Sequence, residues 1–331
     1  MDSMDRVDFL SRGNPHSEHG EREGEAPAAL LTEGATRAPG MDRELFQFYK
    51  MSASGNDFIM IDNRDKVVDQ RFPDVGGFVV KVCRRRLSVG ADGLILIEKS
   101  STVDFSWRFF NADGSEADMC GNGGRCAARF AFVNGIAGKR MAFETLAGVM
   151  KAEILGAQVK LQLTTPNNLK LDYPVVLEHR ELFVSSVNTG VPHVIILTDN
   201  VDHAPVEELG RVLRYHKEFS PHGTNVDFVT VIDKKNVKLR TYERGVEGET
   251  LACGTGAVAA SVVLKHKGLT GERINLLTRG GEVLRVTVGD EVYLEGDARI
   301  IYIGKLTQEA VDSHRVGNPP SEHGEPGTRA H

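Results

Sequence analysis

A cysteine motif that occurs twice constrains the fold of this chain more than any other feature of its sequence. The copies read Cys120-Gly-Asn-Gly-Gly-Arg-Cys and Cys253-Gly-Thr-Gly-Ala, and further residues match downstream at the same spacing without a gap. The matched pairs are Gly135 with Gly268, Gly138 with Gly271, Arg140 with Arg273, Thr145 with Thr278, Gly148 with Gly281, Gly156 with Gly289 and Leu161 with Leu294. Upstream the register slips by a residue or two, as it does for Asp92 and Asp227. A colinear series of this length indicates two copies of one domain.

Each copy has the same pattern of strands around one apolar helix. Alternating or β-branched runs such as FIMID, LILIE and LRVTV are typical of strands. One segment in each copy, Arg125–Val133 and Ala257–Leu264, is apolar on nearly every side, and a helix of that kind is buried. The sequence therefore predicts an α/β (α+β) fold of two pseudosymmetric domains. Each domain is expected to be a curved, mostly antiparallel sheet or barrel wrapped around a central buried helix.

The repeat and the composition of the chain ends predict the domain boundaries. Both ends are rich in Gly, Glu, Pro and Arg, a composition that buries too little apolar surface to fold. Structure-like patterning begins at Met41, which is a candidate biological start. The expected segments are a disordered tail over 1–43, a first domain over 44–168 completed by a last strand over 299–306, a second domain over 175–298, and a disordered tail over 307–331.

Charge and composition exclude several classes of protein. The net charge is −6 and no stretch forms a basic face, so a nucleic-acid partner is not expected. No apolar run reaches the roughly 18 residues that span a bilayer, and the N-terminus does not resemble a secretory signal. Four cysteines in 331 residues do not make a disulfide framework, and without a C-x-x-C pair a metal site is not expected. These features predict a reduced, cytoplasmic protein.

Cys120 and Cys253 each stand directly before a predicted buried helix, where a thiolate is favoured. A helix start carries unpaired N–H groups and a partial positive charge. The neighbouring glycines let backbone N–H groups approach an anion such as a carboxylate. If a pseudo-twofold axis brings the two helix starts face to face, a carbon between them can lose a proton to one thiolate and gain one from the opposite thiol. Such an inversion needs neither metal nor cofactor.

Five segments then show a family resemblance. They are GNDF (55–58), GADG (90–93), FNADGSEADMCGNGGRC (110–126), NTGVPH (188–193) and YERGVEGETLACGTG (242–256). Together they resemble the diaminopimelate epimerase family, and the match is colinear from about Phe46 to Gly304. The resemblance implies two domains with the active site in the cleft between them, and interconversion of LL- and meso-diaminopimelate for lysine and peptidoglycan biosynthesis. It implies no cofactor and a small-molecule substrate, and members of the family often form homodimers.

The resemblance also assigns roles to individual residues. Cys120 and Cys253 become the catalytic base and acid pair. Binding of the substrate is assigned to Asn56, Asn111, Gly121, Asn122, Asn225, Glu243, Arg244, Gly254 and Thr255, with His193 and Asn188 as auxiliary residues. Arg244 suits a distal carboxylate as a two-pronged donor, and Glu243 suits an ammonium group. His193 belongs to the family's Pro-His pair and is expected beside one thiol.

Two positions depart from the pattern of some family members. Val191 stands where those members have Asn before the Pro-His pair, and Gly93 stands where some have Gln. Neither change touches the cysteines, so both bear on how the substrate is held and leave the type of reaction unchanged.

Two other functions stay open. A proline racemase or hydroxyproline epimerase also uses two cysteines, but a His commonly follows its first Cys-Gly, where this chain has Asn122. A redox-sensing or binding protein would instead join Cys120 and Cys253 in a reversible disulfide. Whether exchange of an α-proton requires both reduced thiols distinguishes that protein from an enzyme.

Overall fold

The structure, a computed structural model, describes residues 44–178 and 180–311. The predicted N-terminal tail over 1–43, with the candidate start at Met41, lies outside the described residues. The same holds for residues 312–331 of the predicted C-terminal tail. The first residues of that tail are described, and there Val311 is buried in a hydrophobic cluster. None of the helices in the described ranges is long and apolar enough to span a membrane.

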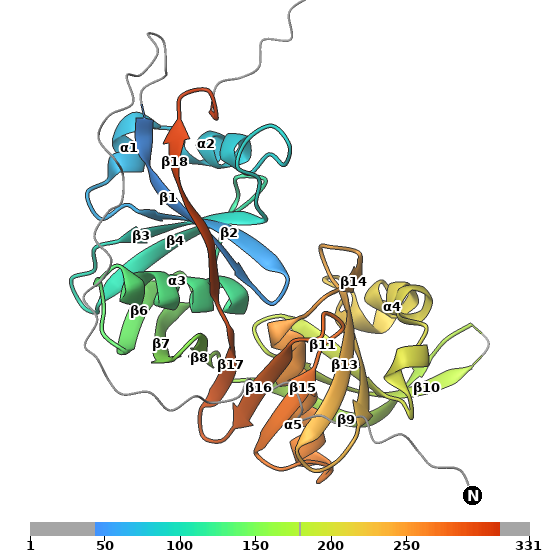
Figure 1. Cartoon of the computed structure of the whole chain (residues 1–331). Helices are drawn as coiled ribbons and strands as arrows, with labels where there is room; N and C mark the ends of the chain where they lie inside the picture. The colour runs from blue at the N-terminus through green and yellow to red at the C-terminus, as the bar shows by residue number, and fades with distance from the viewer. Residues whose placement is uncertain (1–43, 179, 312–331) are drawn as a thin grey trace, which may run out of the picture. The chain divides into compact units, whose positions relative to one another are not determined.

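The first copy of the repeat places three helices among eight strands of the described chain (Figure 1). The strands are β1 (Glu44–Ala53), β2 (Asn56–Asp62), β3 (Gly93–Glu98), β4 (Phe105–Asn111), β5 (Glu116–Ala117), β6 (Arg140–Thr145), β7 (Gly148–Leu155) and β8 (Gln158–Leu163). The helices are α1 (Val67–Arg71), α2 (Val75–Val82) and α3 (Gly121–Val133). Figure 1 shows α3 between β1–β4 and β6–β8, which gives this helix strands on opposite sides.

The second copy repeats this order. Its strands are β10 (Glu181–Asn188), β11 (Pro192–Leu197), β12 (Asn225–Val231), β13 (Asn236–Glu243), β14 (Gly248–Thr250), β15 (Arg273–Leu277), β16 (Val283–Val288) and β17 (Val292–Asp297). Its helices are η1 (Val201–His203), α4 (Val206–Arg214), η2 (Lys217–Phe219) and α5 (Gly254–His266). Two further strands, β9 (Asn167–Val176) and β18 (Arg299–Thr307), follow the first and the second copy.

The strand pairings of the two copies correspond one to one. The parallel pair β2–β3 matches β11–β12, and the parallel pair β4–β6 matches β13–β15. The antiparallel neighbours correspond as well, since β3–β4, β6–β7 and β7–β8 match β12–β13, β15–β16 and β16–β17. At the ends, β18 pairs with β1 as β9 pairs with β10. These pairings confirm the predicted α/β fold with a duplicated, mostly antiparallel sheet.

Strand burial follows from having a helix on one face or on both. Strand β3 is buried throughout, because Leu94 and Leu96 face the cluster under α1 and α2 while Ile95 and Ile97 face the cluster around α3. Strand β7 has helix α3 among its neighbours, and its buried and exposed residues alternate along most of its length. The continuous apolar run of β3, which the sequence predicts as a strand, is therefore confirmed, and the alternating burial of β7 follows from the same rule.

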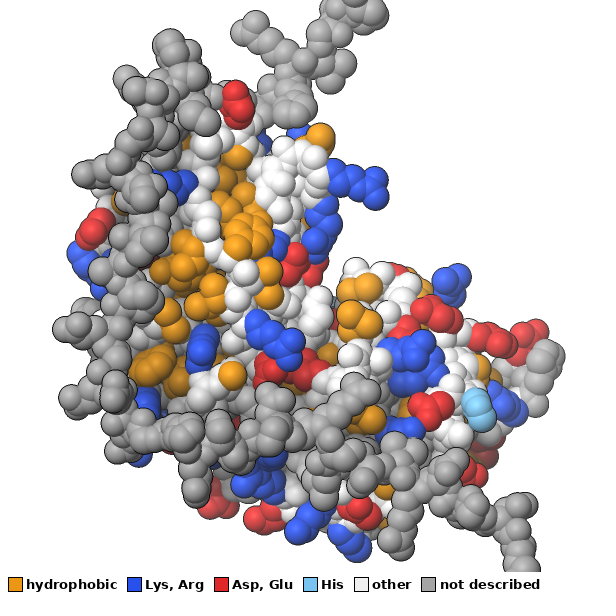
Figure 2. Space-filling view, viewed as in Figure 1, with side chains coloured by type: hydrophobic (Ala, Val, Ile, Leu, Met, Phe, Trp, Pro, Cys, Tyr) orange, Lys and Arg blue, Asp and Glu red, His pale blue; other side chains and the backbone are white. Residues whose placement is uncertain are grey.

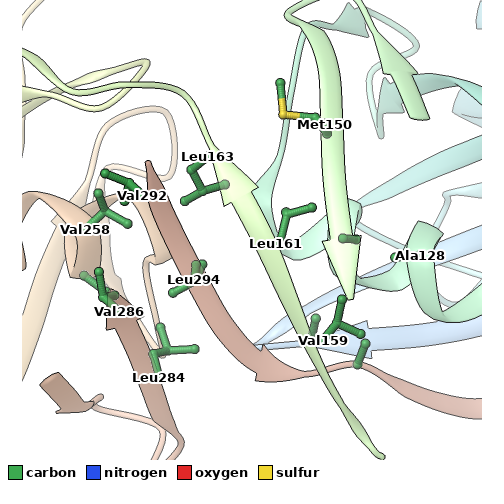
Figure 3. Packing of buried hydrophobic residues seen from close by; sticks show 14 of the residues in the cluster. Ala128, Met150, Val159, Leu161, Leu163, Val258, Leu284, Val286, Val292 and Leu294 are labelled. Atoms are coloured by element: carbon green, nitrogen blue, oxygen red, sulfur yellow. The ribbon is translucent and has the colours of Figure 1, made fainter. Parts of the chain in front are cut away.

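The two copies share one hydrophobic core where β8 pairs with β17. Leu161 lies opposite Leu294, and these residues are also partners in the sequence repeat, so the local pseudo-twofold axis passes between them. Figure 3 shows the side chains of the two strands in one cluster with Leu284 and Val286 of β16. Burying each of these side chains stabilises the fold by about 1.5–3 kcal/mol.

Candidate active site

Cys120 is the N-cap residue of α3. Its backbone is extended (φ −143°, ψ 121°), and the N–H of Gly123 donates a hydrogen bond to its Sγ at 3.5 Å. Burial raises the pKa of the thiol and the charge of Glu243 adds to the rise, while the Gly123 N–H and the Arg125 guanidinium lower it. Burial is the largest of these effects. The stabilisation of the thiolate by the helix start, which the sequence predicts, is therefore only one of the effects that set the pKa of Cys120.

Cys253 has the same place on α5. The N–H of Gly256 donates to its Sγ at 3.4 Å, and the Thr255 hydroxyl lies 3.4 Å from the same sulfur atom. Burial raises the pKa of this thiol well above its usual range, and the carboxylates of Glu243 and Asp227 raise it further. The two thiols therefore share a helix-start geometry but differ in the charges that act on them, since Glu243 influences both, Arg125 influences Cys120 and Asp227 influences Cys253.

The starts of α3 and α5 lie next to each other. A methyl group built on Gly254 would be 3.7 Å from Asn122 Oδ1, so glycine leaves room for the Asn122 amide. The Thr189 hydroxyl donates to the Thr255 carbonyl at 3.2 Å and ties the start of α5 to the turn between β10 and β11. Backbone N–H groups of both helices therefore converge on one region that carries both cysteines.

Asn56 and Asn122 are joined directly. Asn122 Nδ2 donates to Asn56 Oδ1 at 2.7 Å, and Asn122 Oδ1 accepts from Arg125 Nη2 at 3.0 Å. Asn56 Nδ2 in turn donates to Asp92 Oδ2 at 3.0 Å. This chain of amides fixes both predicted binding residues at the start of α3.

Asn225, Arg244 and Glu243 lie where β12 begins and β13 ends. Asn225 Oδ1 accepts from the backbone N–H of Arg244 at 2.8 Å, and its Nδ2 donates to the Pro192 carbonyl at 3.0 Å. Arg244 is half-buried and its Nη1 donates to the His222 carbonyl at 3.2 Å. Burial raises the pKa of Glu243, whose charge influences both thiols. Glu243 is therefore within electrostatic reach of both cysteines.

His193 and Asp227 form a fully buried pair on the neighbouring strands β11 and β12. Nδ1 of His193 lies 2.7 Å from Asp227 Oδ2, and Asp227 Oδ1 accepts from the Thr241 hydroxyl at 2.7 Å. His193 Nε2 has no hydrogen-bond partner among the described residues. A methyl group on Gly256 would lie 2.3 Å from Asp227 Oδ1, which places this carboxylate against the first turn of α5.

Comparison with known proteins identifies the family. A family model described as diaminopimelate epimerase matches residues 48–168 and 185–301. The chain belongs to the diaminopimelate epimerase family. A diaminopimelate epimerase of Aquifex aeolicus is 46% identical over 278 residues, which cover 80% of this chain and 99% of the relative. One from Archaeoglobus fulgidus is 40% identical over 273 residues, covering 78% of this chain and 95% of the relative.

Solved structures of low identity share the fold. A phenazine biosynthesis protein of the PhzF family from Bacillus anthracis has a TM-score of 0.61 at 16% identity, covering 78% of this chain and 98% of that protein. A hydroxyproline epimerase from Agrobacterium vitis has a TM-score of 0.58 at 17% identity, covering 80% and 92%. At these identities the likeness concerns the fold alone, and it agrees with the predicted fold of the epimerase family.

Two residues assigned by the family resemblance bond within their own turns. Asn111 is exposed and its Nδ2 donates to Ser115 Oγ at 3.1 Å, and Asn188 Oδ1 accepts from the N–H of Gly190 at 2.9 Å. Gly121 at the start of α3 leaves space bounded only by leucine side chains of β8 and β17. A binding role for these residues therefore stays a prediction.

The Gly93 departure from the pattern of some family members has a structural reason. Gly93 is buried, and a methyl group there would lie 2.6 Å from the Phe110 carbonyl oxygen and 2.8 Å from the Phe109 ring. This backbone does not accept the Gln of other family members at position 93. Val191 is half-buried in the turn before Pro192. Nothing in its surroundings explains why Asn is replaced there.

Three residues of the site were missed from the sequence, namely Asp92, Asp227 and Arg125. Asp92 holds Asn56, and Asp227 holds His193. Asp92 and Asp227 occupy corresponding positions in the internal repeat, and this correspondence could have identified both residues from the sequence. For Arg125 the usable signal was its place in the repeat, where the corresponding residue of the other buried helix is Val258. Within the described ranges, no three metal-ligating side chains gather at this site or elsewhere.

Proposed function

We propose that this chain interconverts LL- and meso-diaminopimelate, with Cys120 and Cys253 moving the α-proton and with neither metal nor cofactor taking part. The observation that carries the proposal is the pair of cysteine-capped helices whose starts lie side by side. Family membership supports diaminopimelate as the substrate, since the similar proteins from Aquifex aeolicus and Archaeoglobus fulgidus bear that enzyme name.

The proton transfer uses one sulfur on each face of the α-carbon. One cysteine, as thiolate, takes the α-proton, and the opposite thiol gives a proton to the other face. The α-carbon is thereby inverted, and the two sulfurs exchange protonation states. Negative charge that develops on the substrate carboxylate is stabilised by backbone N–H groups at the two helix starts, including those of Gly254 and Thr255.

The second amino-acid end of the substrate needs a cation and an anion, and Arg244 and Glu243 supply them. The guanidinium of Arg244 can bind a carboxylate with two parallel hydrogen bonds. Asn225 positions this residue by accepting its backbone N–H. The carboxylate of Glu243 can receive an ammonium group. Two helix starts for one carboxylate and Arg244 for the other match a substrate with two amino-acid ends.

Glu243 also links binding to the protonation of the thiols. Its charge raises the pKa of Cys120 and of Cys253. An ammonium group paired with Glu243 offsets that charge, so bound substrate favours the thiolate form that the reaction requires. The fraction of thiolate in the site thereby rises as substrate binds.

The proposal extends to the assembly and the location of the protein. We expect a cytoplasmic homodimer that serves lysine and peptidoglycan biosynthesis. Strand β18 exposes three neighbouring apolar side chains, Ile301, Tyr302 and Ile303, at 45–55%. Figure 2 shows hydrophobic side chains gathered over this part of the first copy. Size-exclusion chromatography with light scattering tests the dimer: a single species at the monomer mass across micromolar concentrations contradicts it.

Incubation of the reduced full-length protein with LL-diaminopimelate in D₂O tests the function. We expect loss of the α-proton signal in NMR and formation of the meso isomer without added cofactor. L-proline, L-glutamate and L-lysine are parallel controls. Exchange with one of these and not with diaminopimelate would retain the two-cysteine chemistry and overturn the substrate. No exchange with any of them, after thiol titration has verified reduction, would overturn the proposed activity.

A further inference from the structure

Arg125 in α3 is a buried cation that forms no ion pair with a carboxylate of the described residues, although the charges of Glu282 and Asp297 act on it. Its side chain is 0% exposed and is the largest among the fully buried ones of the described chain. Nη2 donates to the Ser54 hydroxyl and to Asn122 Oδ1, and Nε donates to the Asp297 carbonyl at 3.5 Å. Nη1 is buried and has no hydrogen-bond partner among residues 44–178 and 180–311. Burial lowers the pKa of Arg125, yet a guanidinium keeps its proton at neutral pH.

The fold itself does not require an arginine at this place. In the internal repeat Arg125 corresponds to Val258, which is buried in α5 within the same hydrophobic core. A buried charge is more costly than a well-packed apolar side chain of similar size. The two copies therefore differ here for a reason other than packing.

The guanidinium is hydrogen-bonded to Asn122 at the start of α3, and its Nη1 atom reaches toward the start of α5. A methyl group on Gly254 would lie 4.0 Å from Arg125 Nη1, and one on Gly296 would lie 3.2 Å from Arg125 Cζ. The two glycines thus leave the room that the guanidinium occupies. Asn122, which Arg125 holds, presents its other amide atom to Asn56.

We propose that Arg125 is a positioning residue of the α3 helix start, which fixes the Asn122 amide against Asn56 and adds a permanent positive charge on the Cys120 side of the site. This inference deepens the proposed function and rests on it. It makes the two thiols unequal, since the corresponding place behind Cys253 is apolar. Cys120 is then the sulfur that carries the negative charge when one proton is lost from the pair.

Replacing the charge tests the proposal without substrate. Arg125→Met keeps most of the side-chain volume and removes the cation. The rate of iodoacetamide alkylation is followed against pH, with each cysteine quantified by mass spectrometry. We expect the Cys120 midpoint to rise by about one pH unit or more, with a smaller change at Cys253. Arg129→Met, one turn further along α3 at a partly exposed arginine, is the matched control and should leave both midpoints in place.

Steady-state kinetics give a second test, because the loss of a purely structural residue would not produce a kcat that recovers at high pH. At neutral pH, kcat of Arg125→Met should fall about tenfold or more and recover as the pH is raised, because the lost thiolate returns. Arg125→Lys keeps the charge but lacks the fork that holds Asn122, so its KM should rise while the Cys120 midpoint stays near the wild-type value.

Several results would overturn the inference. An unchanged Cys120 midpoint in a folded Arg125→Met protein does so, and so does an equal rise at both cysteines. Thermal unfolding shows whether that variant folds. If it does not, Arg125→Lys decides, since wild-type KM and kcat in this variant exclude a positioning role. If the wild type fails to epimerise diaminopimelate while the selective Cys120 shift is found, the proposed function fails and the role of Arg125 stands.

Discussion

The protonation of the Cys120 and Cys253 thiols depends on opposing effects that act within a few ångströms. A helix start stabilises the thiolate through N–H groups and its partial positive charge, whereas burial disfavours any charge. At Cys120 and Cys253 burial is the larger effect, and nearby carboxylates add to it. For the proposed proton transfer, one of these thiols must lose its proton when substrate binds, and an ammonium group paired with Glu243 would favour that loss.

The two capping cysteines should be indispensable while their buried neighbour is not. Cys120→Ala and Cys253→Ala should each lower the rate of epimerisation by about 10³-fold or more, because either loss removes the acid or the base on one face. Cys126→Ala, which changes a fully buried thiol of the same motif, is the control and should keep most of the activity. The measurement is formation of the meso isomer by chiral chromatography. Near-normal turnover in Cys253→Ala would end the two-base mechanism.

Asp227 should raise the pKa of one cysteine and not of the other. Its charge raises the pKa of Cys253, so Asp227→Asn should lower that pKa and increase the thiolate fraction at any given pH. The alkylation midpoint of Cys253 is expected to move about one unit toward acid, with Cys120 unchanged. The titratable neighbours Glu243 and His193 stay in place in this variant.

The matched control for that substitution is Asp233→Asn. Asp233 is exposed in the turn between β12 and β13, and its carboxylate accepts hydrogen bonds from that turn. Its replacement should move neither midpoint. An equal shift at both cysteines in Asp227→Asn would mean that the whole site has rearranged, and would contradict a local electrostatic effect.

At the scale of elements, glycines at the helix starts allow close packing that other residues would prevent. In α5, a methyl group on Gly256 would lie 2.3 Å from Asp227 Oδ1. In α3, one on Gly124 would lie 2.8 Å from Leu161 of β8. The glycines of the helix starts therefore allow close packing as well as the approach of an anion to backbone N–H groups. The sequence predicts only the second of these roles.

Gly256→Ala should destabilise the protein by about 1–3 kcal/mol, because the added methyl group would overlap the carboxylate of Asp227. That carboxylate is held by hydrogen bonds and is not the free end of a flexible side chain. Gly271→Ala is the matched control. A methyl group there would meet nothing within 4 Å, and its φ is not in the left-handed region. The free energy of unfolding from urea titration should differ between the two variants by this amount. Equal stabilities would show that Asp227 moves aside without cost.

At this scale, the sequence predicts a structural feature when the residues that cause it lie within one stretch of the chain. The apolar segments Arg125–Val133 and Ala257–Leu264 predicted the buried helices, because burial on every side leaves a pattern in one stretch of chain. The bonds of Asn111 could not be predicted from its motif, since a turn partner close in sequence satisfies its amide. Asp227 and Arg125 meet their partners through strand register and helix packing over long separations. Motif reading alone does not supply those contacts.

For the whole molecule, the pairing of β8 with β17 has the largest consequence. It joins the two copies of the repeat by backbone hydrogen bonds and by one hydrophobic cluster that contains residues around both α3 and α5. Domain boundaries near 168 and 175 stay a prediction from sequence. Because the two copies share one core, we expect them to unfold together and not as two independent domains.

That expectation can be tested with the only tryptophan. Trp107 lies in β4 of the first copy, and Leu284 is fully buried in β16 of the second (Figure 3). Leu284→Ala should destabilise the protein by about 2–5 kcal/mol and lower the denaturant midpoint seen by Trp107 fluorescence by as much as the midpoint seen by circular dichroism. Val212→Ala, at a half-exposed position on α4, is the control and should move neither. A Trp107 midpoint that stays in place while circular dichroism resolves two steps would mean that the copies unfold as independent domains. The sequence-derived boundary would then be the physically relevant one, and the contacts between β8 and β17 would be too weak to couple the two halves.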